Sequence, residues 1–247
     1  YNATKTTLEA AGIGYFGTQS TYIFEKDGIR IGFFGLNSTA FNGNKKWVKD
    51  EIARFKSEEH VNAVVCVFHG GQEYGKHRNA SQETFAHYMI DAGADLIIMH
   101  HPHVVQGMEI YKDRSICYSL GNFCFGGNCE VRAIEALVVG ASLYFTDDGT
   151  YIGQQLDLYP ANISGTNPES NYQPLLVSGQ QAQDVMALIQ NDTDYTLVPF
   201  TDEAGKAAQP YLPASADAPL PQGSDSAATA TDAAADAGAD TGFLVQE

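Results

Sequence analysis

The segment His101-Pro102-His103 carries the clearest chemical signal in the 247-residue sequence. In an extended backbone, residues two apart point to the same side, and a proline disfavours helix at the residue before it. We therefore expect the two imidazoles to enter one space. Neutral rings there suit one divalent metal, or two metals about 3.5–4 Å apart with one ring on each. The alternative is a pair of ordinary surface or core histidines with satisfied hydrogen bonds.

A third histidine, His69, favours the metal interpretation. It follows 63–68, a continuous apolar run typical of a strand buried on both faces. The run 95–99 repeats this pattern before His100, and the segment 79–92 between the two runs has helical periodicity. Strand, helix and strand with short joints predict a right-handed crossover in a parallel sheet, which brings both histidine loops to one sheet edge.

Polar groups around these histidines are candidates for supporting roles. Glu73 could be a metal ligand, a hydrogen-bond acceptor behind a ligand, a general base, or simply a solvated loop acid. His100 could be a catalytic partner that faces the substrate, although its side should be opposite that of His101, so a structural role is equally open. Tyr74, Ser119 and Asn122 are candidates for binding substrate or orienting the ligands, and Asn122 is equally interpretable as a turn residue.

The other elements predict an α/β fold, a sandwich of mixed sheets covered by helices. We expect a hairpin over 21–36, antiparallel strands forming a second sheet over 104–158, and helices over 1–12, 44–60 and 178–191. Residues 1–200 are assigned to this domain. Residues 201–247 are rich in Ala, Asp, Ser and Thr, and we interpret them as a flexible acidic tail.

Charge and motifs exclude several functions. The net charge of -16 disfavours binding to nucleic acid, and the phosphate-loop and nucleophile-elbow motifs are absent. Nor does the sequence contain a signal peptide or an apolar run of membrane-spanning length. Cys66 is expected in the core, whereas Cys124 and Cys129 flank a turn and could form a local disulfide. His60, His77 and His87 lack partners at metal-ligand spacing.

Three blocks of sequence together resemble a known family. They are 68–74 (FHGGQEY), 93–104 (GADLIIMHHPHV) and 118–123 (YSLGNF). In this order they resemble the bacterial capsule-synthesis CapA family, which is associated with poly-γ-glutamate biosynthesis and related to calcineurin-like metallophosphatases. The resemblance implies an α/β/β/α core with a site for two divalent metals (Mn, Zn or Fe). It places His69, His101 and His103 on the metal-binding histidine positions of the family.

The same resemblance implies that part of the site lies outside this sequence. The early Asp, Asp/His and Asn-His blocks of the family are not found in residues 1–247, and we expect them upstream of Tyr1. We therefore expect a metallophosphatase-like fold that lacks its N-terminal part, with a metal site that is weakly occupied in the isolated chain.

Two functions are compatible with the resemblance. One is a phosphoesterase-type hydrolase acting in the synthesis of capsule or poly-γ-glutamate. The other is a non-catalytic surface protein that binds or guides an anionic polymer in the export machinery. The expected partners are poly-γ-glutamate or a phosphate ester, together with other capsule-synthesis proteins. The family acts at the cell surface, usually behind an upstream membrane anchor.

Overall fold

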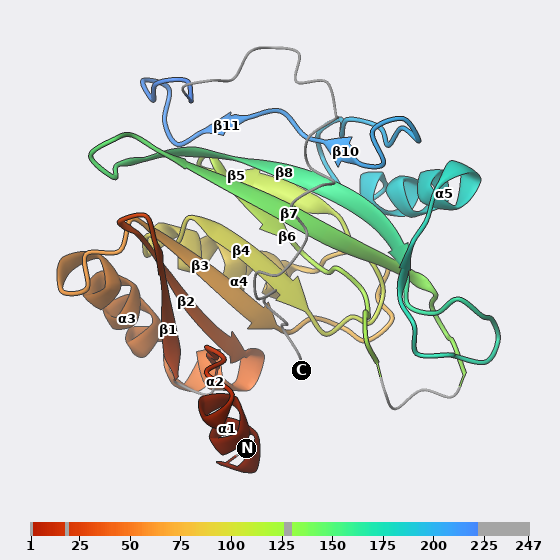
Figure 1. Ribbon diagram of the computed structural model, residues 1–247, viewed down its shortest axis with the longest axis horizontal. Coiled ribbons are helices and arrows are strands. Elements are labelled where there is room, and N and C mark those ends of the chain that lie inside the picture. The colour runs from red at the N-terminus through yellow and green to blue at the C-terminus, as the bar shows by residue number, and fades with distance from the viewer. Residues whose placement is uncertain (1, 18–19, 126–129, 222–247) are drawn as a thin grey trace.

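Two β-sheets face each other in the computed structural model, which describes residues 2–17, 20–125 and 130–221 (Figure 1). The predicted α/β architecture, with mixed sheets and flanking helices, is confirmed. Among the described residues, no helix is both long and apolar enough to cross a membrane.

The first sheet has six strands in the order β1-β2-β3-β4-β6-β5. Its four central strands are parallel, and the two outer strands run antiparallel to their neighbours. The predicted hairpin and the predicted crossover between the histidine strands are both present. The strands are β1 (Thr21–Lys26), β2 (Ile29–Asn37), β3 (Ala63–His69), β4 (Leu96–His100), β5 (Met108–Tyr111) and β6 (Arg114–Cys117).

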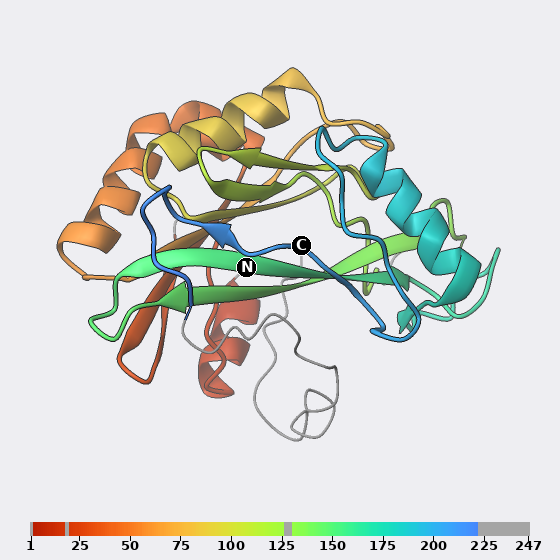
Figure 2. The same ribbon diagram turned by 90° about the horizontal axis from the view of Figure 1, so that it is seen from above.

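Three helices cover one face of this sheet, namely α2 (Ser38–Gly43), α3 (Lys45–Ser57) and α4 (Ala80–Asp91) (Figure 2). The α4 helix begins at a capping box in which the Asn79 side chain accepts hydrogen bonds from the first turn and Gln82 bonds back to the Asn79 backbone. Burial of apolar side chains between the helices and the sheet holds this layer in place. Its fully buried members include Phe34, Phe41, Ile52, Phe55, Phe68 and Met89.

The second sheet lies against the opposite face of the first. It is built on the long antiparallel pair β7 (Glu135–Phe145) and β8 (Tyr151–Asn162), and short strands pair with the other side of β8. These are β9 (Leu175–Leu176), β10 (Ala207–Ala208) and β11 (Leu212–Pro213). Helix α5 (Gly179–Gln190) packs beside β8 through Val185, Met186 and Ile189, in the core that joins the two sheets.

Two expectations about this region differ from the structure. We expected the strands of 104–158 to form the second sheet, but β5 and β6 extend the first, because β6 pairs in parallel with β4. The composition predicts a tail that begins at residue 201, but β10 and β11 pair with β8, and the buried Gln209 bonds to the backbone of Val198. The folded part therefore continues beyond residue 200, and residues 222–247 lie outside the described part.

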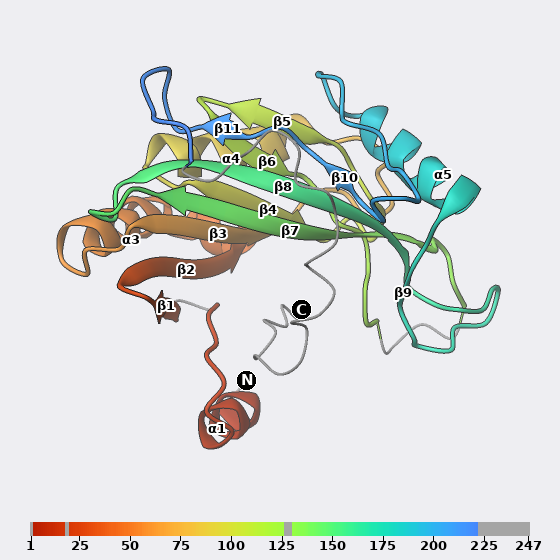
Figure 3. The same ribbon diagram turned by 45° about the horizontal axis from the view of Figure 1, so that its top comes forward.

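Helix α1 (Asn2–Ala10) stands apart from both sheets, and none of its residues is buried (Figure 3). The linker after it returns to the body of the fold, where Phe16 stacks on Phe33 with ring centroids 5.7 Å apart. Cys66 is fully buried in the core, as expected. Cys129, one half of the disulfide considered above, lies outside the described residues.

Candidate metal centre

The two histidine-bearing strands end side by side. His69 is the last residue of β3 and His100 the last of β4, and they are paired in register. The backbone continues this contact for one residue, because Gly70 N donates to His100 O at 2.9 Å. The crossover predicted from local periodicity thus brings both histidine loops to one sheet edge.

The segment 101–103 is a turn, and the expectation of an extended backbone is wrong. His101 has φ 106° and His103 has φ 59°, both in the left-handed half of backbone space. A hydrogen bond joins this segment to the loop that follows β3, because Tyr74 N donates to Pro102 O at 2.7 Å. The two rings still lie together, with centroids 5.9 Å apart, but a bend with positive φ at both histidines brings them there in place of strand alternation.

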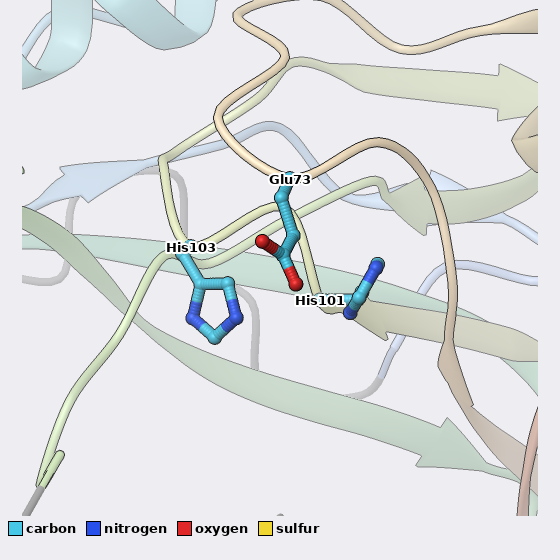
Figure 4. A group of neighbouring side chains, drawn as sticks. All are labelled: Glu73, His101 and His103. Atoms are coloured by element: carbon cyan, nitrogen blue, oxygen red, sulfur yellow. The ribbon is translucent and has the colours of Figure 1, made fainter. Parts of the chain in front are cut away.

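Glu73, His101 and His103 form a group whose possible ligand atoms all lie within 4.8 Å of one another. Glu73 comes from the loop after β3, and its carboxylate points between the two imidazoles (Figure 4). The carboxylate side chain is exposed and the histidines are half-buried. Two imidazoles and one carboxylate are a donor set that zinc, manganese and iron accept, so the residues present fit a divalent cation.

Asn122 fixes the tautomer of His103. Its Oδ1 lies 2.7 Å from His103 Nδ1, and because an amide oxygen can only accept, the ring must donate its Nδ1–H. In neutral imidazole the proton-free nitrogen is then Nε2, the form that binds a metal. Ser119 is buried, and its hydroxyl accepts from Gly121 N at 3.3 Å. Ser119 therefore holds the turn that presents Asn122.

The His69 ring contacts the His101 ring. The distance from His69 Nε2 to His101 Nδ1 is 3.0 Å, and the ring centroids are 4.6 Å apart. If the His101 ring donates this hydrogen bond, its own Nε2 is left proton-free. The structure thus brings together all three histidines of the sequence-based ligand set, but Glu73, rather than His69, completes the group within mutual ligand distance.

His100 occupies different surroundings. It lines the apolar space between the two sheets, together with side chains such as Val67 and Ile98. Burial, together with the smaller effect of the nearby His69, lowers the pKa of His100 from 6.5 to about 4. His100 is therefore neutral at neutral pH, consistent with the structural role considered for it.

Tyr74 connects the histidine group to a positive charge. Its ring stacks on that of His103 with centroids 5.9 Å apart, and the Arg132 guanidinium lies 5.7 Å from the centroid of the tyrosine ring. Phe125 contacts the His103 ring edge-on at 5.4 Å. Sequence reasoning missed Arg132 and Phe125, since no local pattern links them to the histidines.

Comparison with known proteins decides the family. The model of the family described as bacterial capsule synthesis protein PGA_cap matches residues 2–127, just over half of the 247 residues. The chain belongs to this family. The matched range includes both histidine loops and Asn122, so the PGA_cap match covers the whole group described above except Arg132.

Two relatives carry names that agree with this assignment. The capsule biosynthesis protein CapA of Bacillus anthracis is 32% identical over 191 residues, which cover 67% of this chain and 45% of that protein. The PGA biosynthesis protein CapA of Bacillus subtilis (strain 168) is 34% identical over 122 residues, or 49% of this chain and 32% of that protein. The chain thus spans less than half the length of these relatives.

A solved structure of a hypothetical protein from Thermus thermophilus is also similar, with 13% identity and a TM-score of 0.37. The match covers 57% of this chain and 61% of that one.

Proposed function

We propose that this chain contributes a metal-binding, phosphoesterase-type site to a protein of capsule or poly-γ-glutamate synthesis. Glu73, His101 and His103 would hold a divalent cation, and the substrate would be an anion, either a phosphate ester or a group on an anionic polymer. The observation that carries the proposal is the convergence of these three side chains within 4.8 Å at one edge of the first sheet.

The side chains around the group support its use as a metal site. Asn122 holds His103 in the tautomer that leaves Nε2 proton-free. The hydrogen bond between His101 and His69 restrains the second ring. Partners of this kind orient ligands and tune their basicity. We assign Glu73 to the metal, rather than to proton transfer, because its carboxylate lies within ligand distance of both rings.

A bound divalent cation would polarise a phosphoryl oxygen and lower the pKa of a coordinated water. The chain itself would contribute the binding and orientation of the anion. Arg132 lies over the Tyr74 ring, which stacks on His103, and it is a cation in a chain of net charge -16. We assign it to attraction of the anionic group, because the acidic surface would otherwise repel such a substrate.

Metal titration tests the proposal. Zn²⁺ and Mn²⁺ would be titrated calorimetrically into the chain and into Glu73→Gln and His103→Ala. Loss of one ligand should weaken binding by about tenfold or more. His60→Asn, at an exposed histidine outside the group, is the matched control and should bind like the wild type. Equal affinity in all four proteins, or no binding by any of them, would refute the proposed site.

Hydrolysis is tested separately. The full-length gene product would be assayed on a chromogenic phosphomonoester and phosphodiester with and without chelator. Activity that disappears with chelator and with His103→Ala supports the phosphoesterase. Metal binding with no hydrolysis, together with polymer binding, would instead support the non-catalytic role of binding or guiding an anionic polymer.

The setting of this activity is also a proposal. The names of the two CapA relatives refer to capsule and PGA biosynthesis. We propose that this protein acts with other capsule-synthesis proteins at the cell surface, where a capsule is assembled.

A further inference from the structure

A polar pocket of about 370 Å³ lies at the end of the second sheet, where Figure 1 shows helix α5 beside β8 and β9. A pocket of this volume is large enough to hold a small molecule. Most of its lining is polar, and of the described residues that line it none is Lys, Arg or His. An anion therefore meets no positive charge here, which distinguishes this pocket from the proposed anion site beside His103.

Two polar side chains of the strand pair lie next to each other in the lining. Glu135, the first residue of β7, is the register partner of Asn162, the last residue of β8. Side chains directly opposite in an antiparallel pair lie on the same face of the sheet, with Cβ atoms about 5 Å apart. Since both residues line the pocket, it receives the Glu135 carboxylate and the Asn162 amide together.

Both side chains lack a partner within the protein. In the part of the chain that the structure describes, neither makes a hydrogen bond or an ion pair with another residue. Glu135 is half-buried, and Asn162 is only 7% exposed. A buried amide without partners costs free energy and is uncommon in folded proteins. What remains exposed of Asn162 lines the pocket, so a ligand that enters there can supply the missing hydrogen bonds.

The rim of the pocket is held in place by hydrogen bonds within the loop that follows β8. Ser164 is 1% exposed, and its Oγ accepts from Thr166 N at 3.1 Å and from Asn171 N at 3.0 Å. The Asn171 Oδ1 accepts from Gly165 N at 2.9 Å. Side-chain bonds to nearby backbone of this kind fix the course of a loop. The pocket is therefore formed by the chain itself before any ligand binds.

Helix α5 adds a second carboxylate to the lining. Asp184 lines the pocket from this helix, together with Gln181 and the buried Val185. The Asp184 Oδ1 accepts from Gln180 Nε2 at 2.8 Å, which leaves its other oxygen for a ligand. Two carboxylates without a basic residue in the lining favour a positively charged ligand. Amide groups both donate and accept, so those of Asn162 and Gln181 complement hydroxyl groups.

We propose that this pocket binds a small organic ammonium compound that also carries hydroxyl groups, which is the chemistry of an amino sugar. The ammonium group pairs with Glu135, Asp184 adds to the negative potential, and Asn162 binds a neighbouring hydroxyl. A hydrogen bond between two charged groups is stronger than a neutral one, so the ammonium group supplies most of the selectivity. A bare metal ion would leave most of the volume unfilled.

Calorimetric titration with glucosamine tests the charge preference. The full-length gene product would be titrated at about pH 6, where the amine is protonated, with chelator present. Glucose is the matched probe because a hydroxyl replaces the ammonium group. Glucosamine should bind at least about tenfold more tightly than glucose. Glu135→Gln should abolish this preference, whereas Glu203→Gln, at an exposed acid outside the pocket, should retain it.

Replacement of Asn162 separates ligand binding from a structural role. Asn162→Leu has nearly the same shape but cannot form hydrogen bonds, and it should weaken glucosamine binding about fivefold or more. Because the amide has no partner in the protein, its loss should leave the urea midpoint of the unliganded protein unchanged or higher. A lower midpoint would assign Asn162 to structure and would overturn the inference.

Three other results would also overturn it. The first is no binding of glucosamine, or equal binding of glucosamine and glucose. The second is glucosamine binding that neither Glu135→Gln nor Asn162→Leu weakens. The third is binding of Ca²⁺ in chelator-free buffer that Glu135→Gln abolishes, which would assign the pocket to a metal ion. The sugar titrations contain chelator and change none of the histidines, so this pocket and the proposed metal site can fail separately.

Discussion

Replacement of Asn122 is the sharpest test of how the proposed metal centre is organised. Asn122 is 9% exposed, and its Oδ1 accepts from His103 Nδ1 at 2.7 Å. Asn122→Ala removes this acceptor and leaves the ring free to rotate or to adopt the other tautomer. Loss of such a partner costs about 10- to 100-fold in metal affinity, or about 1.4–2.8 kcal/mol.

Asn122→Asp serves as the matched variant because a carboxylate accepts the same hydrogen bond more strongly. We expect it to bind metal at least as tightly as the wild type. The assay is competition for Zn²⁺ against a chromophoric chelator at pH 7.5, with circular dichroism to check folding. The reasoning is refuted if the alanine variant keeps wild-type affinity, or if the aspartate variant loses as much affinity as the alanine variant.

Three further predictions concern buried groups. The pKa of His100 is about 4 in the folded protein and about 6.5 in the unfolded chain, so on acidification the unfolded chain binds a proton at His100 first. In the presence of chelator, the free energy of unfolding should therefore fall by up to about 3 kcal/mol between pH 6.5 and 4. Urea titrations should show a smaller fall for His100→Gln, and an equal fall would contradict the assignment. Asp192→Ala should destabilise the fold by about 3 kcal/mol, since the buried carboxylate accepts from two backbone amides; a change below about 1 kcal/mol in urea would count against this role. Burial raises the pKa of the Cys66 and Cys117 thiols, so the native protein should be labelled at Cys124 and not at these two, as peptide mass mapping would show.

The histidine strands could be predicted because their signals are local. The continuous apolar run that forms β3, the helical periodicity of α4 and the apolar run that forms β4 each specify one element. The rule that parallel crossovers join neighbouring strands then places His69 beside the loop that carries His101. Proximity of these two rings thus follows from sequence.

Other features depend on contacts that no local pattern encodes. The hairpin of β5 and β6 is visible in the sequence, but its membership of the first sheet depends on pairing with β4. The contact of Asn122 with His103 spans 19 positions. That of Arg132 with the Tyr74 ring is also long-range. The same holds for the expected tail, where short strands are stabilised by β8 and not by their own composition.

The conformation of the histidine loop was missed for a related reason. Strand alternation and the proline predicted an extended segment, but His101 and His103 both have positive φ. The hydrogen bond from Tyr74 N to Pro102 O ties the turn to the neighbouring loop, so tertiary contact overrides the local preference. The same tie brings Glu73, the residue before Tyr74, close to the two rings.

Anomalous X-ray diffraction at the zinc edge tests the central claim most directly. Crystals grown with Zn²⁺ should show a peak at about 2.0–2.2 Å from a carboxylate oxygen of Glu73 and from one nitrogen each of His101 and His103. A difference map with no peak at this group, or with zinc bound only elsewhere on the surface, would contradict the account.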